Sequence, residues 1–314
     1  MTVVMQMAPV FFLIGLGYLL AHRAAFQDRF WADAERLTFY CLFPALLIYS
    51  IGGADLGDLA KMWPMATALI VATLLQAATA VRLRDVLAGS PFNLDGPGFC
   101  SVFQGITRPN TYIGLAVAFA LYGEAGLALM AIDVLAIIPL VNILSVMVHQ
   151  RWAHRSHLTT QPLSGLDVLI DSLKNPVVIA CLTGALLNLS GIGLPPVIGP
   201  TLNILGKGAL PVGLMAVGAG LQFSSLTKNP GLYAGIALAK LLALPTMTWM
   251  TGVALGLDGI TLKVAVLFAA LPVSATSYVM SRQMNGDAPM TASIITTTTL
   301  ASLISLPLVI AIVS

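Results

Sequence analysis

Residues 108–111 read Arg-Pro-Asn-Thr and interrupt an apolar segment that spans residues 97–122. A second interruption, Pro-Val-Ser-Ala-Thr-Ser at residues 272–277, lies in the middle of the apolar segment 260–284. Proline removes a backbone donor and clashes with the carbonyl four residues earlier, and small polar side chains beside it can bond the groups that are released. Both segments are therefore predicted to be helices that break near their middle.

The composition of the chain excludes a water-soluble fold. Of 314 residues, 15 are Lys or Arg and 13 are Asp or Glu, so that 9% of the chain is charged, where a soluble domain has about a quarter. Hydrophobic residues make up 58%, and the polar surface is too small to cover a globule of this size. We expect a polytopic membrane protein. Nucleic acid is excluded as a partner, because the net charge of +2 provides no clustered basic surface.

A membrane-spanning helix needs about 20 apolar residues, and charges, Pro and Gly clusters and polar turns divide this chain into ten such segments. The predicted fold class is all-α, with transmembrane helices at residues 3–21, 34–51, 62–81, 97–122, 125–148, 174–191, 200–222, 230–256, 260–284 and 288–313. No positive charge precedes the first span, and His22 and Arg23 follow it. We therefore expect this span to stay in the membrane with its N-terminus outward.

The basic residues indicate the orientation, since Lys and Arg favour cytoplasmic loops. Loops after odd-numbered spans hold ten of the 15, namely Arg23, Arg29, Arg36, Arg82, Arg84, Arg151, Arg155, Lys174, Lys228 and Arg282. Loops after even-numbered spans hold only Lys61 and Lys263. Both termini are thus predicted on the outer face of a bacterial inner membrane. The histidines of the longest loop, His149, His154 and His157, could suggest a metal site, but topology explains this basic stretch better. No metal and no cofactor is predicted.

A weak internal repeat divides the chain into residues 1–148 and 174–314, joined by a predicted cytoplasmic linker at 149–173. A shift of 167 places Pro9 on Pro176, Gly17 on Gly184, Pro44 on Pro211 and Gly53 on Gly220, and a shift of 163 places Pro109 on Pro272 and Gly123 on Gly286. Five spans in each half is an odd number, so the second half must enter the membrane from the opposite side. Such inverted repeats are frequent in secondary transporters.

Arg108 is the basic residue closest to the first break. An arginine near the bilayer centre costs a few kcal/mol, so it should face the bundle interior or a cavity. On an unbroken helix it would share a face with Gln104 and Thr111. Its planar guanidinium suits a carboxylate clamp. It could equally form a structural ion pair with Asp133, or extend to a cytoplasmic vestibule.

Asp133 lies in the fifth predicted span, and an isolated carboxylate in an apolar site favours its protonated form. This residue is a candidate for proton coupling, and the alternative is a permanent ion pair with Arg108 or Lys240. Asn142 lies nine residues further, which is half a turn away on a regular helix. Asp133 and Asn142 are therefore predicted to face different directions. Lys240, inside the eighth span, is a second candidate for coupling or a vestibule residue.

Around the two breaks the sequence resembles the auxin efflux carrier (AEC) family, whose bacterial members are relatives of the plant PIN carriers. The resemblance covers nearly the whole chain, and its motifs are Arg108-Pro109-Asn110-Thr111-Tyr112-Ile113-Gly114-Leu115 with Tyr122-Gly123, Phe43-Pro44-Ala45-Leu46, Lys174-Asn175-Pro176, Leu210-Pro211-Val212 with Gly218 to Leu221, and Leu271-Pro272 with Tyr278-Val279. Many relatives have a proline near position 116, where this chain has Ala116. Here Pro109 precedes the asparagine, which predicts a displaced break.

The resemblance implies two inverted five-helix repeats, as in bile-acid symporters and cation antiporters. Spans 1, 2, 6 and 7 would form a scaffold, and spans 3–5 and 8–10 a transport domain that moves as an elevator. Spans 4 and 9 would cross at their breaks and hold the substrate, with the family's asparagine at Asn110 and its second proline at Pro272. Members are often homodimers and carry organic anions such as auxin or dicarboxylates.

Together these features predict a secondary carrier for a small organic anion, with proton coupling as one option. The candidate substrate-binding residues are Gln104, Arg108, Pro109, Asn110, Thr111, Pro272, Ser274, Thr276 and Ser277, and the candidate coupling residues are Asp133 and Lys240. The alternative is a sodium-coupled symporter or a cation/proton antiporter of the same topology. The ninth span has no acidic residue before Asp287, which argues against it. An enzyme is not expected, because the sequence has no His-Glu-x-x-His motif and no histidine inside a predicted span.

Overall fold

In the computed structural model, the described residues form helices, and seven of these are long and apolar enough to cross a membrane. The described residues are 3–23, 26, 28–54, 62–92, 94–153, 166, 170, 173–223 and 229–313. Candidate spans are Val3–His22, Arg29–Gly52, Trp63–Arg82, Thr111–Trp152, Ile198–Ala219, Pro230–Ala254 and Ala288–Val313, and two shorter apolar helices are Pro176–Leu189 and Gly259–Ala269. A polytopic membrane protein follows from this count, as the composition predicted.

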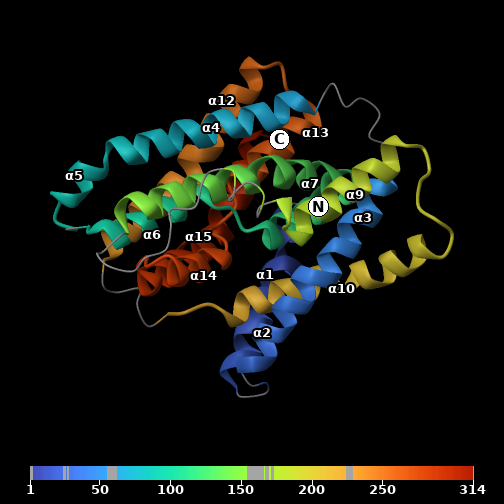
Figure 1. Ribbon diagram of the computed structural model, residues 1–314, viewed down its shortest axis with the longest axis horizontal. Coiled ribbons are helices and arrows are strands. Elements are labelled where there is room, and N and C mark those ends of the chain that lie inside the picture. Colours follow the sequence, from blue (N-terminus) through green and yellow to red (C-terminus); the bar gives the residue numbers. More distant parts are fainter. Residues whose placement is uncertain are drawn as a thin grey trace.

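Figure 1 shows how the helices are arranged. In chain order they are α1 (Val3–His22), α2 (Asp28–Leu37), the π-helical turn η1 (Thr38–Leu42), α3 (Phe43–Gly52), α4 (Trp63–Arg82), α5 (Arg84–Ala88), α6 (Gly96–Thr107), α7 (Thr111–Trp152), α9 (Pro176–Leu189), α10 (Ile198–Ala219), α11 (Pro230–Leu238), the π-helical turn η3 (Ala239–Ala243), α12 (Leu244–Ala254), α13 (Gly259–Ala269), α14 (Thr276–Gln283) and α15 (Ala288–Val313).

Each of the ten ranges predicted from the sequence falls on one or more of these helices. The range 34–51 covers the end of α2, η1 and α3, and the range 230–256 covers α11, η3 and α12. The range 97–122 covers α6 and the first part of α7, while α13 and α14 together occupy 260–284. Residues 154–165 of the predicted linker, with His154 and His157, lie outside the described residues.

The long helix α7 is a hairpin rather than a rod. Its 42 residues would extend about 63 Å at 1.5 Å per residue, roughly twice a bilayer core. Gly123 instead adopts φ 62° and ψ −148°, which suits glycine. A Cβ atom on Gly126 would lie only 2.6 Å from the carbonyl oxygen of Ala118. The second arm returns beside α6, where the Cys100 thiol approaches the Val148 carbonyl oxygen at 3.6 Å.

Both helix breaks predicted at the prolines are confirmed. The helix α6 ends at Thr107 and α7 begins at Thr111, while α13 ends at Ala269 and α14 begins at Thr276. The two non-helical segments meet in an antiparallel β-bridge between Pro109 and Val273. The breaks of helices far apart in the chain thus lie against each other.

Contacts between the two halves follow the sequence offset of 167 residues. The helix α1 packs on α10, and α3 packs on α9. A Cβ atom on Gly17 would overlap the backbone of Met215, and one on Gly184 would lie 3.3 Å from the Cα atom of Ile48. Since Gly184 is 167 residues after Gly17, and Met215 is 167 after Ile48, these are equivalent contacts. The starts of α6 and α13, Gly96 and Gly259, follow the second offset of 163.

The helices of the two halves mix in space. In Figure 1, α10 of the second half lies beside α2 and α3 of the first half, in the lower and right part of the view, whereas α4, α5 and α6 lie toward the left and the top. Between these groups, the Ser50 hydroxyl of α3 donates to the Glu124 carboxylate at the bend of α7, at 3.0 Å. This contact joins the two sides of the molecule.

Candidate functional site

A cavity of about 600 Å³ opens beside the two helix breaks. Its polar lining consists of Arg108, Thr111, Asn142, Asn175, Ser274, Thr276 and Gln283, and its other lining residues are Phe39, Pro109, Tyr112, Val134, Ile138, Val141, Val146, Val177, Val279, Met280 and Met284. These lining residues include no Asp or Glu. A volume of this size is typical of sites for small molecules.

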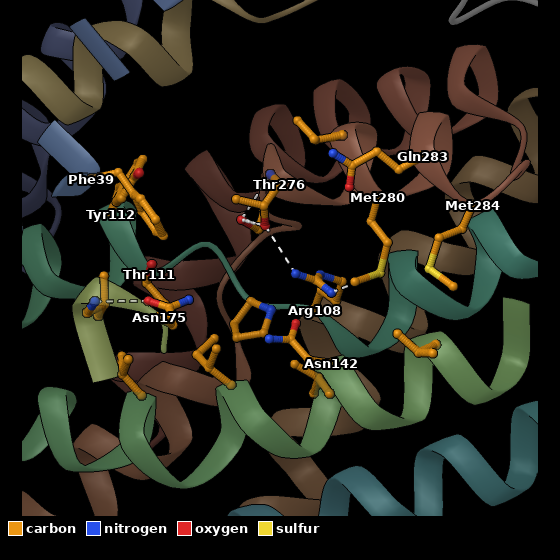
Figure 2. A pocket seen from close by; sticks show the side chains of 18 residues that line it. Phe39, Arg108, Thr111, Tyr112, Asn142, Asn175, Thr276, Met280, Gln283 and Met284 are labelled. Carbon is orange, nitrogen blue, oxygen red and sulfur yellow. Dashed lines mark hydrogen bonds between the residues drawn. The ribbon is translucent and has the colours of Figure 1, made fainter. Parts of the chain in front are cut away.

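Arg108 supplies the positive charge of the cavity. Its amide still donates to the Gln104 carbonyl oxygen at 3.0 Å, and its extended conformation ends α6, so that Thr111 no longer continues the helical face of Gln104. One guanidinium nitrogen donates to the Thr276 hydroxyl at 3.2 Å, and the other terminal nitrogen lies 3.3 Å from the Met280 sulfur, a weak acceptor. The Nε atom is buried and has no hydrogen-bond partner among the described residues. Figure 2 shows this side chain beside Thr276 and Met280.

Two helices begin at this cavity. Asn110 caps α7, because its side-chain oxygen accepts hydrogen bonds from the amides of Tyr112 and Ile113 at 3.1 and 3.3 Å. At the start of α14, the Ser274 and Thr276 hydroxyls bond each other at 2.9 Å. Helix N-termini carry partial positive charge. The cavity therefore combines a guanidinium with the positive ends of two helices.

Aromatic and amide side chains complete the lining, and sequence reasoning did not select them as site residues. Phe39 comes from the π-helical turn η1, and Tyr112 stacks on Phe43 with ring centroids 4.6 Å apart. Asn175 caps α9 by accepting from the Val177 amide at 2.9 Å. Asn175 belongs to the motif Lys174-Asn175-Pro176, which carries the family resemblance, and this motif could have indicated Asn175 as a site residue. No signal in the sequence singles out Phe39.

Four of the nine predicted binding residues do not line the cavity: Gln104, Asn110, Pro272 and Ser277. Asn110 and Ser277 are buried and adjacent in sequence to lining residues, and in the described part of the chain the Asn110 side-chain nitrogen and the Ser277 hydroxyl have no hydrogen-bond partner. Buried polar atoms are normally paired, so unpaired ones need water or a ligand. The remaining five, Arg108, Pro109, Thr111, Ser274 and Thr276, belong to the wall.

Gln104 takes part in a separate buried network. Its amide nitrogen donates to Ser281 at 3.0 Å and lies 3.2 Å from Nε2 of His149, and Ser281 bonds Thr291 at 2.8 Å. His149 also contacts the Ser145 carbonyl oxygen through Nδ1 at 2.7 Å. The sequence placed His149 in the linker, but α7 continues to Trp152 and His149 is fully buried in it. The expectation that no histidine lies inside a span is thus wrong for this residue.

Comparison with known proteins identifies the family. A family model described as membrane transport protein matches residues 2–310. The chain belongs to the membrane transport protein family. This is the auxin efflux carrier-like family that the two breaks resemble, so that the resemblance is confirmed. The family is one of membrane transporters rather than enzymes.

Two relatives show the extent of the similarity. The chain is 22% identical over 302 residues to an uncharacterized transporter of Methanothermobacter thermautotrophicus, which covers 95% of this chain and 94% of the relative. It is 26% identical over 175 residues to the uncharacterized transporter YfdV of Escherichia coli. That alignment spans 55% of this chain and 55% of the relative.

In this chain, Asp133 is not part of an ion pair with Arg108 or Lys240. Its side chain is fully buried, and neither carboxylate oxygen has a hydrogen-bond partner among the described residues. The permanent ion pair considered from the sequence is therefore wrong. Asp133 is also not among the cavity-lining residues, whereas Asn142 is. The two residues therefore do not line one cavity wall together, as helical periodicity predicted.

Lys240 is buried and is not a vestibule residue. It lies in η3 with 1% of its surface exposed, and its ammonium group donates to the carbonyl oxygen of Ala269 at 3.1 Å. Ala269 is the last residue of α13 before the second break. Lys240 therefore contacts the backbone of the crossing region and is absent from the cavity wall.

Proposed function

We propose that this transporter is a secondary carrier that moves a small organic anion, a carboxylate, across a bacterial inner membrane. Arg108 is the observation that carries the proposal. Its guanidinium has five N–H donors, yet its acceptors in the described structure are one hydroxyl and one thioether. A carboxylate would pair with this planar fork through two charge-assisted hydrogen bonds.

The surroundings of Arg108 favour an anion over a cation. The lining residues of the cavity include no carboxylate, and the first residues of α7 and α14, Thr111 and Thr276, belong to them. The ends of both helices attract negative charge. A cation substrate would favour negatively charged lining residues, whereas the only formal charge among the described lining residues is that of Arg108. The apolar side of the cavity, with Phe39 and Tyr112, suits the hydrocarbon or aromatic body of an organic acid.

The proposed mechanism uses ten spans in two inverted five-helix repeats. An antiparallel bridge, such as that between Pro109 and Val273, has local two-fold symmetry, and inverted repeats are related by a two-fold axis in the membrane plane. The equivalent contacts of Gly17 and Gly184 support the same relation. Each half then crosses the membrane five times, and the hairpin at Gly123 separates two of these crossings.

Alternating access would occur by an elevator movement. The scaffold would comprise spans 1, 2, 6 and 7, which correspond to α1, α2–α3, α9 and α10, and the remaining spans would carry the cavity. The hydrogen bond between Ser50 and Glu124 joins these two bodies and would have to break in each cycle. A homodimer through the scaffold, with both termini on the outer face, completes the proposal.

Asp133 is the proposed coupling group. Its two unpaired, buried oxygens indicate a carboxyl group that is neutral in this conformation, because a buried charge without a partner is strongly unfavourable. Release of this proton in another conformation would couple substrate movement to a proton gradient. Lys240, the other residue considered for coupling, is treated below.

Thermal-shift measurements on the purified protein test the proposed substrate class. A panel of monocarboxylates, dicarboxylates, organic cations and neutral sugars should give a concentration-dependent rise in Tm for one or more carboxylates. A response confined to cations or neutral compounds would contradict the proposal. Size-exclusion chromatography with light scattering would test the homodimer in the same preparation.

A further inference from the structure

The two helix breaks receive side-chain donors at equivalent positions of the repeat. The Gln76 amide of α4 donates to the carbonyl oxygen of Ile106 at 2.6 Å, and Lys240 of η3 donates to that of Ala269 at 3.1 Å. Ile106 and Ala269 are separated by the repeat offset of 163, and the donors by 164. Both donors are buried, with 6% and 1% of their surfaces exposed.

Each acceptor lies at the carbonyl end of a half-helix, immediately before a break. Ile106 is in the last turn of α6, and Ala269 ends α13. The last carbonyl groups of a helix lack partners within the helix and carry partial negative charge. In transporters with broken helices, such ends can coordinate a coupling cation.

The two helix ends differ in the type of side chain that donates to them. The first end is satisfied by the neutral amide of Gln76, and the second by the ammonium group of Lys240. Among the described residues no carboxylate pairs with Lys240, and the buried Asp133 has no hydrogen-bond partner. The Lys240 Nζ atom is therefore bonded to the carbonyl end of α13 rather than to an acidic side chain.

We propose that Lys240 is a tethered cation that takes the place of a bound sodium ion at the carbonyl end of α13. The ammonium stays in this position through the cycle, so that substrate movement does not require sodium. The independence of transport from sodium rests on the proposed function. The occupation of the cation position by Lys240 does not depend on that function.

Sodium-dependent stability of purified variants tests this inference without any carboxylate. Lys240→Ser removes the ammonium and leaves a hydroxyl beside the Ala269 carbonyl, and Gln76→Ser is the matched control at the equivalent position. The Tm of each protein is measured in sodium chloride and in choline chloride, both at about 150 mM. The ionic strength is then the same, so that charge interactions are screened equally in the two salts. Sodium should raise the Tm of Lys240→Ser by about 2–4 °C and leave the wild type and Gln76→Ser unchanged.

Two results would overturn the inference. One is a sodium-dependent rise in the Tm of the wild type, and the other is a folded Lys240→Ser protein that does not respond to sodium. If Lys240→Ser does not fold, Lys240→Gln retains a donor for Ala269 and removes the charge. A lower Tm than that of the wild type is then expected, and an equal Tm would show that hydrogen bonding alone is sufficient. Failure of every carboxylate to bind would contradict the proposed function but leave these results interpretable.

Discussion

The backbone amide of Asn110 donates to the carbonyl oxygen of Pro272 over 2.8 Å. This hydrogen bond joins two helix breaks that are 162 residues apart in the chain. Each proline produces a break, and the released backbone groups of one break bond those of the other. Exposed backbone at membrane depth is thereby satisfied within the protein, and Arg108 is fixed at the edge of a cavity.

The Asn110 side chain should contribute to substrate affinity more than to folding. We expect Asn110→Ser to retain the cap of α7, since serine is also a good cap, and to lose the unpaired side-chain nitrogen. Its Tm should stay close to that of the wild type, while transport into proteoliposomes falls at least about tenfold, as for one lost hydrogen bond of about 1.4 kcal/mol. Asn110→Ala should lose transport as well as about 1 kcal/mol of stability through the cap. Normal transport by either variant would contradict a role of Asn110 in the site.

Asp133 should make transport sensitive to a proton gradient. Uptake into proteoliposomes is expected to change with an imposed pH difference across the membrane, and Asp133→Asn should remove that dependence while preserving the shape of the neutral side chain. Because the carboxyl group has no partner in the described structure, the variant should fold with a Tm similar to that of the wild type. A gradient response that persists in Asp133→Asn would exclude this residue from coupling, and a wild type without any response would indicate a uniporter.

The close crossing of α1 and α10 should tolerate no side chain at Gly17. A Cβ atom there would overlap the Met215 backbone, so Gly17→Ala should destabilise the protein by about 1–3 kcal/mol. Gly15→Ala is the matched control in the same helix, because a Cβ atom at Gly15 has no neighbour within 4 Å. Thermal denaturation in detergent should show a lower Tm for Gly17→Ala alone. Equal Tm values for the two variants would contradict the packing.

Cross-linking can test the elevator movement. Cysteines replacing Ser50 and Glu124 would connect α3 with the bend of α7, in a background without Cys41, Cys100 and Cys181. Bridging this pair with a short bifunctional thiol reagent should stop transport, and cleavage of the bridge should restore it.

A control pair for this experiment lies within the proposed scaffold, where the rings of Tyr18 and Phe223 are 5.0 Å apart. Cysteines bridged at these two positions should leave transport unchanged. Full transport with the bridge between positions 50 and 124 in place would exclude relative movement of the two bodies.

Much of this arrangement could be predicted from local sequence. Proline in an apolar segment has a direct steric effect, so Pro109 and Pro272 indicated both breaks. Helical periodicity correctly separated Asp133 from Asn142. By contrast, the partners of Arg108 and Lys240 are a hydroxyl, a thioether and a backbone carbonyl on other helices. Such tertiary neighbours leave no pattern in one sequence, and charge alone suggested an ion pair that does not form.

The lining residues Phe39 and Tyr112 show the same limit. Each lies in an apolar segment, and helical spacing does not distinguish a cavity wall from ordinary packing, although Tyr112 stands in the motif that carries the family resemblance. His149 was placed in the linker because the apolar segment ends near it, but the helix continues for another turn and buries its ring. Burial at a span end depends on the neighbouring helices α6, α14 and α15, whose approach is determined by the tertiary fold.

Binding of carboxylates to wild-type, Arg108→Gln and Arg84→Gln proteins tests the central proposal most directly. Isothermal titration with the carboxylate that gives the largest thermal shift would provide the Kd of each. Because a charge-assisted hydrogen bond contributes about 1.5–3 kcal/mol, Arg108→Gln should raise Kd by about 10- to 100-fold without a matching loss of Tm. Arg84, which pairs with Asp85 away from the breaks, should give the wild-type Kd when changed to glutamine. An unchanged Kd in a folded Arg108→Gln protein would contradict the assignment of the cavity as an anion site.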